Sequence, residues 1–377
     1  MRIGLNSGPV VVGAIGDDLR MDYTAQGDTA NLAARMETSA EPGTVLVSEQ
    51  TYRLAKEFFE FEPLGKIQVK GKEQPVAAYR LRDKAYRARA RSERAIYSDM
   101  VGRDQELARL ELQVLKAVNG EGSVVNVIGE AGIGKSRLLA ELKKREVVKR
   151  VSFLEGRAIS MGKNLSFHPV IDLLKNWGHI REDDTESIAL NKLEAAIRRV
   201  SADEVDEIFP FVATLMGMKL SGKHAERVKG IEGESLEKLV FKNVRDLLIR
   251  STEIIPIVIV IEDLHWADTS SLLLLDSLYL LARKQKLVFI NVFRPGYWRG
   301  EDVTVETLKE RMPEISVVEI PLQPLDPQSS EALINNMLSI KGLHHGVKGQ
   351  IIERAGGNPF FIEEVVRSLI DEGAVIA

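Results

Sequence analysis

The stretch "VVNVIGEAGIGKSRLL", residues 124–139, decides the fold of most of this 377-residue chain. An apolar, strand-like run leads into a glycine-rich turn, and a helical pattern follows the turn. The turn fits G-x-x-x-x-G-K-[ST], in which glycines at 129, 132 and 134 let backbone N–H groups fold around phosphate oxygens. The positive end of the following helix adds to this attraction. The stretch therefore predicts a phosphate-binding loop between a strand and a helix.

The side chains at the end of this loop have distinct expected roles. Lys135 is expected to reach the β- and γ-phosphates of a nucleotide, and Ser136 to present its hydroxyl to Mg²⁺. Arg137 is counted with the nucleotide-binding residues, together with the loop glycines Gly129, Gly132 and Gly134. An ordinary glycine-rich turn is the alternative, but a strand precedes, a helix follows and a second motif accompanies it. We expect ATP and Mg²⁺ as ligands.

The second motif is "VIVIEDLHWAD", residues 258–268, an apolar strand that ends in Glu262 and Asp263. In a phosphate-binding-loop enzyme, an acid at this point holds Mg²⁺ and its neighbour can polarise the attacking water. We assign Mg²⁺ to Asp263 together with Ser136, and a secondary catalytic role to Glu262. A solvated loop with two acids remains the alternative.

Further apolar runs predict the sheet around these motifs. Runs that are apolar at every position and separated by helical periodicity are typical of a parallel sheet with helices on both faces. The fold class is therefore α/β, with a core over 99–322 and a helical subdomain, or lid, over 323–377. The expected strands are 123–129, 151–156, 255–263, 286–294 and 315–322.

The first 81 residues have a different character. Short β-branched runs at 44–49, 65–71 and 75–81, with helical patterns at 28–38 and 49–57, predict a small α+β unit. The stretch "RLRDKAYRARARSER" follows and carries seven Lys or Arg residues against two acids. We interpret residues 82–98 as a basic, solvated linker between the two regions.

Composition excludes several classes of function. The net charge of −4 gives no overall electrostatic attraction to nucleic acid, so no nucleic-acid surface is expected. The chain has no cysteine, which excludes disulfides and thiolate metal sites. The longest apolar runs are far shorter than the ~20 residues of a membrane span, and no signal peptide is recognisable. A cytoplasmic protein without membrane contact is expected.

Five motifs in one order, "VGRDQEL", "GEAGIGKSRLL", "EDLHWAD", "FRPG" and "GGNPFFIEE", resemble signal-transduction ATPases of the STAND type, related to AAA proteins. The resemblance implies a nucleotide-dependent switch with slow hydrolysis, with Arg294 as a sensor near the γ-phosphate. It also places Pro359, in the 357–359 turn, near the base or the helical lid. A surface arginine and a plain loop are the alternatives. Relatives often have aspartate where Glu262 stands.

The segments "RIGLNSGPVVVGAIG", "DYTAQGDTANLAARME", "PGTVLVSEQTY" and "GKIQVKGKEQPVAAYRL" resemble the carboxy-terminal half of a class III adenylyl or guanylyl cyclase domain. The resemblance implies that Asn31 and Arg35 stabilise the transition state of 3′-oxygen attack on the α-phosphate. It also implies that Lys70 grips the triphosphate and that Thr24 selects adenine. Guanidinium donors suit the charge that builds on phosphorane oxygens.

The metal-binding aspartates of that family lie upstream of where this sequence begins. We therefore expect a piece of a larger cyclase–ATPase fusion that makes no cyclic AMP unless another chain supplies the missing half. A homodimer through the cyclase part is one expected partner, and other protein partners are unknown. A non-catalytic, nucleotide-gated scaffold is the remaining alternative.

Overall fold

The computed structural model describes residues 2–8, 11–15, 22–26, 28–56, 59–68, 75–84, 99–159, 166–296, 315–337 and 345–371. The chain divides into two compact units, Met1–Tyr97 and Ser98–Ala377, and each is described by itself. Strand β6 (Val76–Lys84) continues three residues beyond the expected end of the first region, so the linker begins later than residue 82. The rest of the predicted linker, 85–98, lies outside the described residues.

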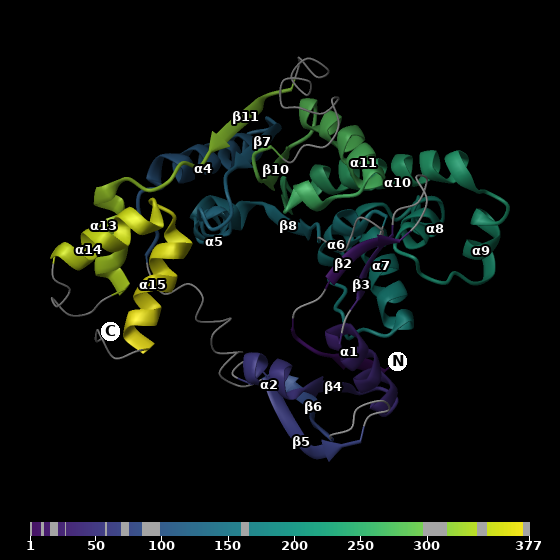
Figure 1. The fold of residues 1–377 in the computed structure, drawn as a ribbon. Coiled ribbons are helices and arrows are strands. Elements are labelled where there is room, and N and C mark those ends of the chain that lie inside the picture. Colours follow the sequence, from purple (N-terminus) through teal and green to yellow (C-terminus); the bar gives the residue numbers. More distant parts are fainter. Residues whose placement is uncertain are drawn as a thin grey trace. The chain divides into compact units, whose positions relative to one another are not determined.

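The larger unit is built on a five-stranded sheet whose paired strands all run parallel (Figure 1). The order is β11-β7-β10-β9-β8, so β10 separates the strand before the phosphate-binding loop from the strand with the two acids. All five expected strands are present, with ends that differ by one or two residues. They are β7 (Ser123–Ile128), β8 (Ser152–Arg157), β9 (Ile257–Glu262), β10 (Leu287–Phe293) and β11 (Val317–Pro321).

Helices cover both faces of this sheet, which is why its strands are mostly apolar and β9 is apolar from Ile257 to Ile261. In β9, Ile257, Ile259 and Ile261 join one buried cluster, whereas Val258 and Val260 join the other. The first cluster takes side chains from α6 (His168–Trp177), α7 (Glu186–Val200), α8 (Val205–Leu215), α10 (Gly233–Ile254) and α11 (Thr269–Tyr279). The second takes them from α4 (Asp104–Val118), α5 (Lys135–Lys143) and the 3₁₀ turn η1 (Glu146–Arg150).

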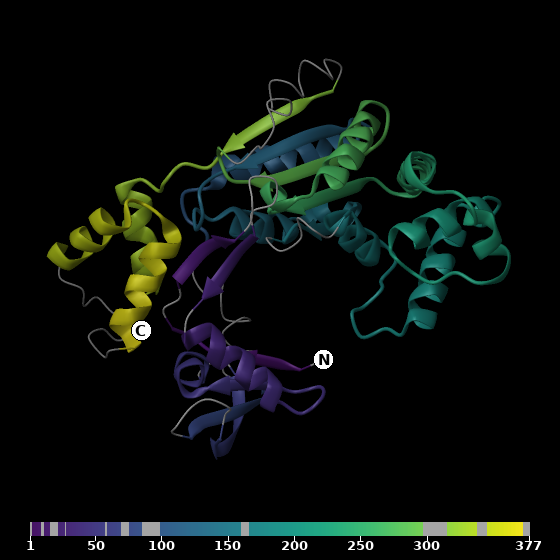
Figure 2. The ribbon, with the colours of Figure 1, turned by 45° about the vertical axis from the view of Figure 1, so that its right-hand side comes forward.

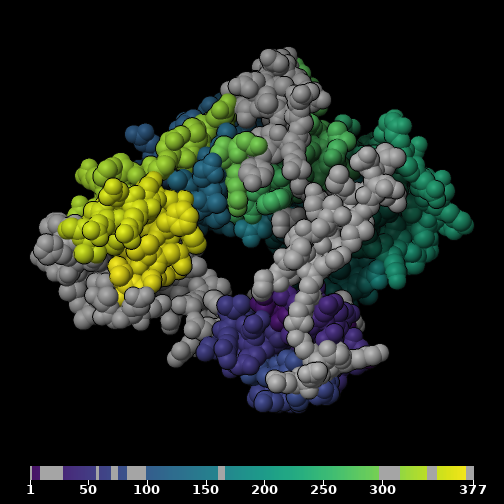
Figure 3. Space-filling view, viewed as in Figure 1, coloured from purple at the N-terminus to yellow at the C-terminus, as the bar shows by residue number. Residues whose placement is uncertain are grey.

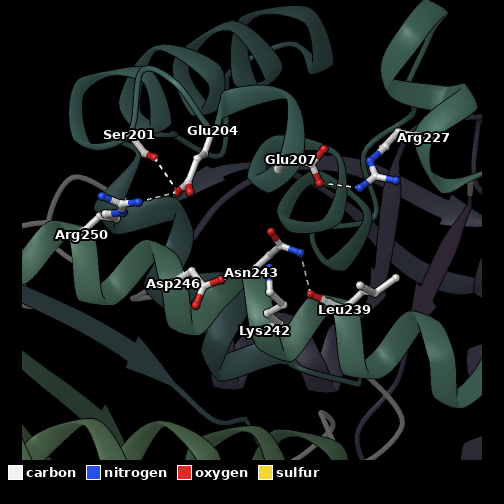
Figure 4. Close-up of polar contacts among 9 residues, drawn as sticks. All are labelled: Ser201, Glu204, Glu207, Arg227, Leu239, Lys242, Asn243, Asp246 and Arg250. Carbon is white, nitrogen blue, oxygen red and sulfur yellow. Dashed lines mark hydrogen bonds and ion pairs between the residues drawn. The ribbon is translucent and has the colours of Figure 1, made fainter.

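Helices α7 to α10 form an insertion between β8 and β9, which includes the short α9 (Gly222–Val228). Figure 4 shows the polar contacts that tie these helices together: the Glu204 carboxylate accepts from Ser201 Oγ at 3.2 Å and from Arg250 at 3.0 Å, and Glu207 pairs with Arg227. The insertion and the carboxy-terminal helices lie on opposite sides of the sheet in both ribbon views (Figure 2).

A buried polar chain crosses the middle of the sheet. Tyr279 Oη donates to Asn291 Oδ1 at 2.9 Å, and Asn291 Nδ2 donates to Asn126 Oδ1 at 3.0 Å. Asn126 and Asn291 are direct partners in the β7–β10 pairing. Burial raises the pKa of the Tyr279 hydroxyl, which stays protonated and can donate. Because unpaired buried amides are costly, these contacts favour this register over a shifted one.

The carboxy-terminal helices form a small body with its own core. They are α13 (Pro327–Met337), α14 (His345–Ala355) and α15 (Pro359–Asp371). The core before them also contains two 3₁₀ turns, η3 (Leu264–Trp266) and η4 (Leu280–Arg283). Leu333, Ile334, Ile362 and Val366 are almost fully buried among them. In the space-filling view their atoms form one lime and yellow group (Figure 3).

The smaller unit contains a four-stranded sheet in the order β1-β4-β6-β5 and a separate β2–β3 pair. Strand β5 (Phe59–Ile67) begins six residues before the predicted run at 65–71, and its pairing with β6 has register shifts between Glu60 and Phe61 and between Pro63 and Gly65, which weaken the alternating pattern. Strand β3 was not predicted. The other elements are β1 (Ile3–Leu5), β2 (Val11–Ile15), β3 (Asp22–Gln26), α1 (Asp28–Ser39), β4 (Val45–Ser48) and α2 (Glu49–Ala55).

Candidate functional site

The site lies where the parallel strands end, the edge at which open α/β sheets bind ligands. Residues 129–134 connect β7 to α5, and α5 begins at Lys135. Gly132 has φ +76° and Gly134 has φ +100°, which are left-handed values that favour glycine. The loop therefore takes a shape that other residues would strain, and it presents the N-terminus of α5 at the strand edge.

Lys135 is held by the loop itself. Its ammonium donates to the carbonyl oxygens of Gly129 and Glu130 at 2.7 and 2.8 Å. Burial lowers the pKa of Lys135, and the nearby Arg294 lowers it further, while Asp263 and Glu130 act in the opposite direction. A partly buried lysine with a second cation nearby gains from an anionic ligand such as a phosphate.

Glu262 lies next to Ser136. The Ser136 hydroxyl donates to Glu262 Oε2 at 2.9 Å. Asp263 is the next residue, but it takes a left-handed conformation, φ +54°, as the chain turns into η3. The sequence-based assignment paired Ser136 with Asp263, whereas the hydrogen bond joins Ser136 to Glu262.

Arg157 adds a cation to this carboxylate pair. It ends β8, directly opposite Glu262 in the β8–β9 register. Its Nη2 lies 3.5 Å from Glu262 Oε2, and its Nε lies 3.5 Å from Asp263 Oδ2. Sequence inspection did not single out Arg157. It becomes recognisable only once β8 is known to neighbour β9.

Arg294 follows β10, the strand between β7 and β9. This position brings it close enough to lower the pKa of Lys135 and of His265, whose pKa is lowered first by burial and raised by Asp263. Arg294 is half-buried. The predicted sensor arginine thus shares one site with the loop lysine and the acids.

The turn before α15 contacts the back of the phosphate-binding loop. Asn358 Nδ2 donates to the carbonyl of Ala131 at 2.9 Å, and the Phe360 N–H donates to the carbonyl of Gly132 at 3.2 Å. A β-carbon on Gly132 would lie 2.7 Å from Phe360 Cβ. Pro359, between these two residues, is the first residue of α15.

Arg103, from the "VGRDQEL" motif, is a further residue to which the sequence analysis gave no role. It is only 6% exposed. Its guanidinium donates to the carbonyl of Ile133 at 3.3 Å and to that of Gln323 at 2.5 Å, and pairs with Glu106. It therefore ties the loop to the segment that leads into the carboxy-terminal helices.

The other predicted residues either lie apart from this cluster or fall outside the residues that the structure describes. Arg137 pairs with Glu141 one turn along α5, at 2.9 Å. In the smaller unit, Asn31 is exposed and Arg35 half-buried on α1, at the i, i+4 spacing that puts both on one helical face. Thr24 lies in β3, but its side chain is outside what the structure describes, and Lys70 lies outside the described residues.

A parallel sheet with a strand inserted between loop and acids, and with Lys135, Ser136 and Glu262 at one edge, defines a P-loop nucleoside triphosphatase fold. The sequence model of the AAA ATPase domain matches residues 99–290, so the chain belongs to that family. Residues 1–83 match the adenylate and guanylate cyclase catalytic domain, and 327–376 match a domain of unknown function. The chain joins part of a cyclase domain to an ATPase domain.

Individual relatives agree with this division. An uncharacterized protein of Rhizobium meliloti is 25% identical over 90% of this chain, and adenylate cyclase type 9 of Gallus gallus is 44% identical over 20% of it. The chain spans 32% and 6% of these two relatives. A solved STAND protein with a tetratricopeptide repeat sensor, from Pyrococcus horikoshii, is 17% identical, with 70% of this chain and 30% of that chain covered and a TM-score of 0.33.

The residues fit ATP with Mg²⁺. A hydroxyl and a carboxylate in direct contact, Ser136 and Glu262, are the oxygen ligands that Mg²⁺ takes beside nucleotide phosphates. The loop offers glycine backbone and a lysine for those phosphates. Among the helices that the structure describes, none is long and apolar enough to cross a membrane.

Proposed function

We propose that the chain binds ATP with Mg²⁺ and acts as a nucleotide-dependent switch that hydrolyses ATP slowly. The hydrogen bonds from Asn358 and Phe360 to successive carbonyls of the phosphate-binding loop carry this proposal. A loop that must rearrange its backbone around phosphates cannot do so without affecting these bonds. The carboxy-terminal helices therefore sense whether the loop is filled.

In the proposed mechanism, the N–H groups of 132–136 bind the phosphates, and Lys135 leaves the carbonyls of Gly129 and Glu130 to contact the γ-phosphate. Ser136 and Glu262 would hold Mg²⁺, which would supply positive charge against the nucleotide phosphates. We assign the metal to Glu262 in place of Asp263 because Glu262 contacts Ser136. Asp263 is then free to orient the attacking water.

Binding is tested by calorimetry with ATP and Mg²⁺. Lys135→Ala should weaken ATP binding by about one to two decades, the scale of losing a charge-assisted hydrogen bond worth about 1.5–3 kcal/mol. Lys149→Ala, which removes a lysine exposed in η1, should bind like the parent. Equal affinities for the parent and Lys135→Ala would refute nucleotide binding at this loop.

The switch is tested by hydrogen exchange of α13–α15 with and without ATP. Asn358→Ala removes the bond to Ala131. We expect ATP to change exchange in these helices in the parent and to change it much less in the variant. If both proteins respond to ATP alike, the turn does not couple loop and helices. ATP binding without any phosphate release would favour the scaffold over the slow ATPase.

A second candidate function is a share in cyclic nucleotide formation, supported by the match of residues 1–83 to the cyclase catalytic domain. On this proposal Asn31 and Arg35 contribute transition-state donors, and a homodimer or a longer chain completes the site. Cyclic AMP should be measured for this chain alone and for this chain mixed with a separately expressed amino-terminal half of a cyclase catalytic domain. Arg35→Ala should lower any activity by about two to three decades.

A further inference from the structure

The guanidinium of Arg157 makes only long ion pairs, whereas its main chain is fixed by hydrogen bonds. Its ion pairs with Glu262 and Asp263 both measure 3.5 Å, longer than the about 2.7–2.9 Å of a charge-assisted hydrogen bond, and its side chain is 56% exposed. Its main-chain N–H, however, donates to Asp172 Oδ2 at 3.0 Å, and the next N–H, of Ala158, donates to the Glu262 carbonyl at 3.0 Å. The guanidinium can therefore move while the strand stays in place.

In the described part of the chain, Glu262 and Asp263 form ion pairs with Arg157 alone. Of the other two cations of the site, Lys135 donates to backbone carbonyls, and Arg294 forms no ion pair with either acid among the described residues. Two adjacent carboxylates repel each other, and a guanidinium keeps its charge at every physiological pH. Arg157 is therefore the cation that lies within ion-pair distance of both carboxylates.

One atom has two partners. Glu262 Oε2 accepts from the Ser136 hydroxyl at 2.9 Å and also faces Arg157 Nη2 at 3.5 Å. A divalent cation held by Ser136 and Glu262 would occupy the space next to this oxygen and would repel the guanidinium. The two cations compete for the same carboxylate.

We propose that Arg157 is the counter-ion of Glu262 and Asp263 in the nucleotide-free protein, and that the divalent cation which arrives with ATP displaces it from Glu262. This inference rests on the proposed function, in which Glu262 holds Mg²⁺. Arg157 then lowers the affinity of the nucleotide-free site for free divalent cations. Only a metal that arrives with the phosphates binds well, which couples metal binding to nucleotide binding.

The test measures Mn²⁺ binding to the nucleotide-free 377-residue protein by the loss of the free Mn²⁺ paramagnetic resonance signal. Arg157→Gln should bind Mn²⁺ about threefold to tenfold more tightly than the parent, the scale of removing one or two exposed ion pairs. Arg157→Lys, which keeps the charge, should stay close to the parent. The gain should shrink at high salt. Arg198→Gln removes an equally exposed arginine from the inserted helices and should change nothing.

Unchanged or weaker Mn²⁺ binding by Arg157→Gln would overturn the inference, and so would the absence of Glu262-dependent binding from both proteins. Glu262→Gln distinguishes a failure of the role given to Arg157 from a failure of the metal assignment to Glu262. If Glu262→Gln abolishes Mn²⁺ binding while Arg157→Gln does not change it, only the role of Arg157 fails. If Glu262→Gln leaves both Mn²⁺ and Mg²⁺-dependent ATP binding intact, the metal assignment of the proposed function fails.

Discussion

Glu262 and Asp263 are neighbours in sequence, but their backbones place them in different surroundings. Glu262 is still in β9, so its carboxylate stays with the strand edge and contacts Ser136. Asp263 has left the strand in a left-handed conformation. A strand reverses the direction of its side chains at each residue, and the turn after β9 adds a second change of direction. Two adjacent acids therefore need not share one role.

This difference predicts separate effects of the two amide substitutions. Glu262→Gln should remove most of the Mg²⁺ dependence of ATP binding, because it replaces the metal carboxylate with a neutral group. Asp263→Asn should leave that dependence largely intact and lower phosphate release instead. Calorimetry at several Mg²⁺ concentrations and a phosphate-release assay check both effects. The reverse pattern would restore Asp263 as the metal residue.

At the scale of elements, the phosphate-binding loop is shaped from outside as well as by its own glycines. Its carbonyls at 131, 132 and 133 accept hydrogen bonds from Asn358, Phe360 and Arg103. Asn358 directly precedes α15, Phe360 lies in its first turn, and Arg103 directly precedes α4. Each bond fixes one carbonyl of the loop from outside. The backbone shape of the loop therefore depends on its neighbours as well as on its glycines.

A substitution at Gly132 tests the packing of the loop against Asn358 and Phe360. Gly132→Ala should destabilise the protein for two reasons: alanine is strained at φ +76°, and its β-carbon would lie 2.7 Å from Phe360 Cβ and 2.8 Å from Asn358 Oδ1. Gly217→Ala is the matched control, because Gly217 has φ +70° and nothing within 4 Å of a β-carbon. We expect a loss of about 1–2 kcal/mol at Gly217 from the backbone alone and a larger loss at Gly132. Urea unfolding of both variants measures the loss in free energy of unfolding. Equal losses would mean that the turn before α15 moves away from the new β-carbon without further destabilisation.

At the scale of the whole molecule, the chain consists of two compact units with separate cores. The sites follow the same division: Asn31 and Arg35 lie in the first unit, whereas every residue of the proposed ATP site lies in the second. Fusing part of a cyclase domain to an AAA ATPase domain thus leaves each site within its own unit.

A polypeptide of residues 98–377 should consequently bind ATP as tightly as the 377-residue chain. Each side chain and backbone group assigned to the ATP site belongs to this unit, whose sheet and both covering layers of helices are complete within it. Calorimetry on the two proteins, together with circular dichroism to compare their folding, makes the test. A shorter protein that folds but binds ATP at least tenfold more weakly would show that the first unit contributes to the site.

The sequence by itself predicted the phosphate-binding loop and the apolar strand that ends in two acids. Gly132 and Gly134 take positive φ angles, and the run that leads to Glu262 is apolar from Ile257 to Ile261 because helices cover both its faces. Local patterns of this kind need no knowledge of distant partners. The same reasoning predicted the five parallel strands, but it missed β3 and misplaced β5, where a short run and register shifts blur the alternation.

Only the tertiary structure decided which side chains meet. Ser136 and Glu262 are 126 residues apart, and Asn358 and Ala131 are 227 residues apart. The strand order β11-β7-β10-β9-β8 sets these contacts, since it brings Arg294 between loop and acids and puts Arg157 opposite Glu262. Strand order depends on how the buried faces pack and on contacts such as the hydrogen bond from Asn291 to Asn126 across the sheet. No local pattern encodes that choice, because it depends on the free energy of the whole sheet and the helices packed on it.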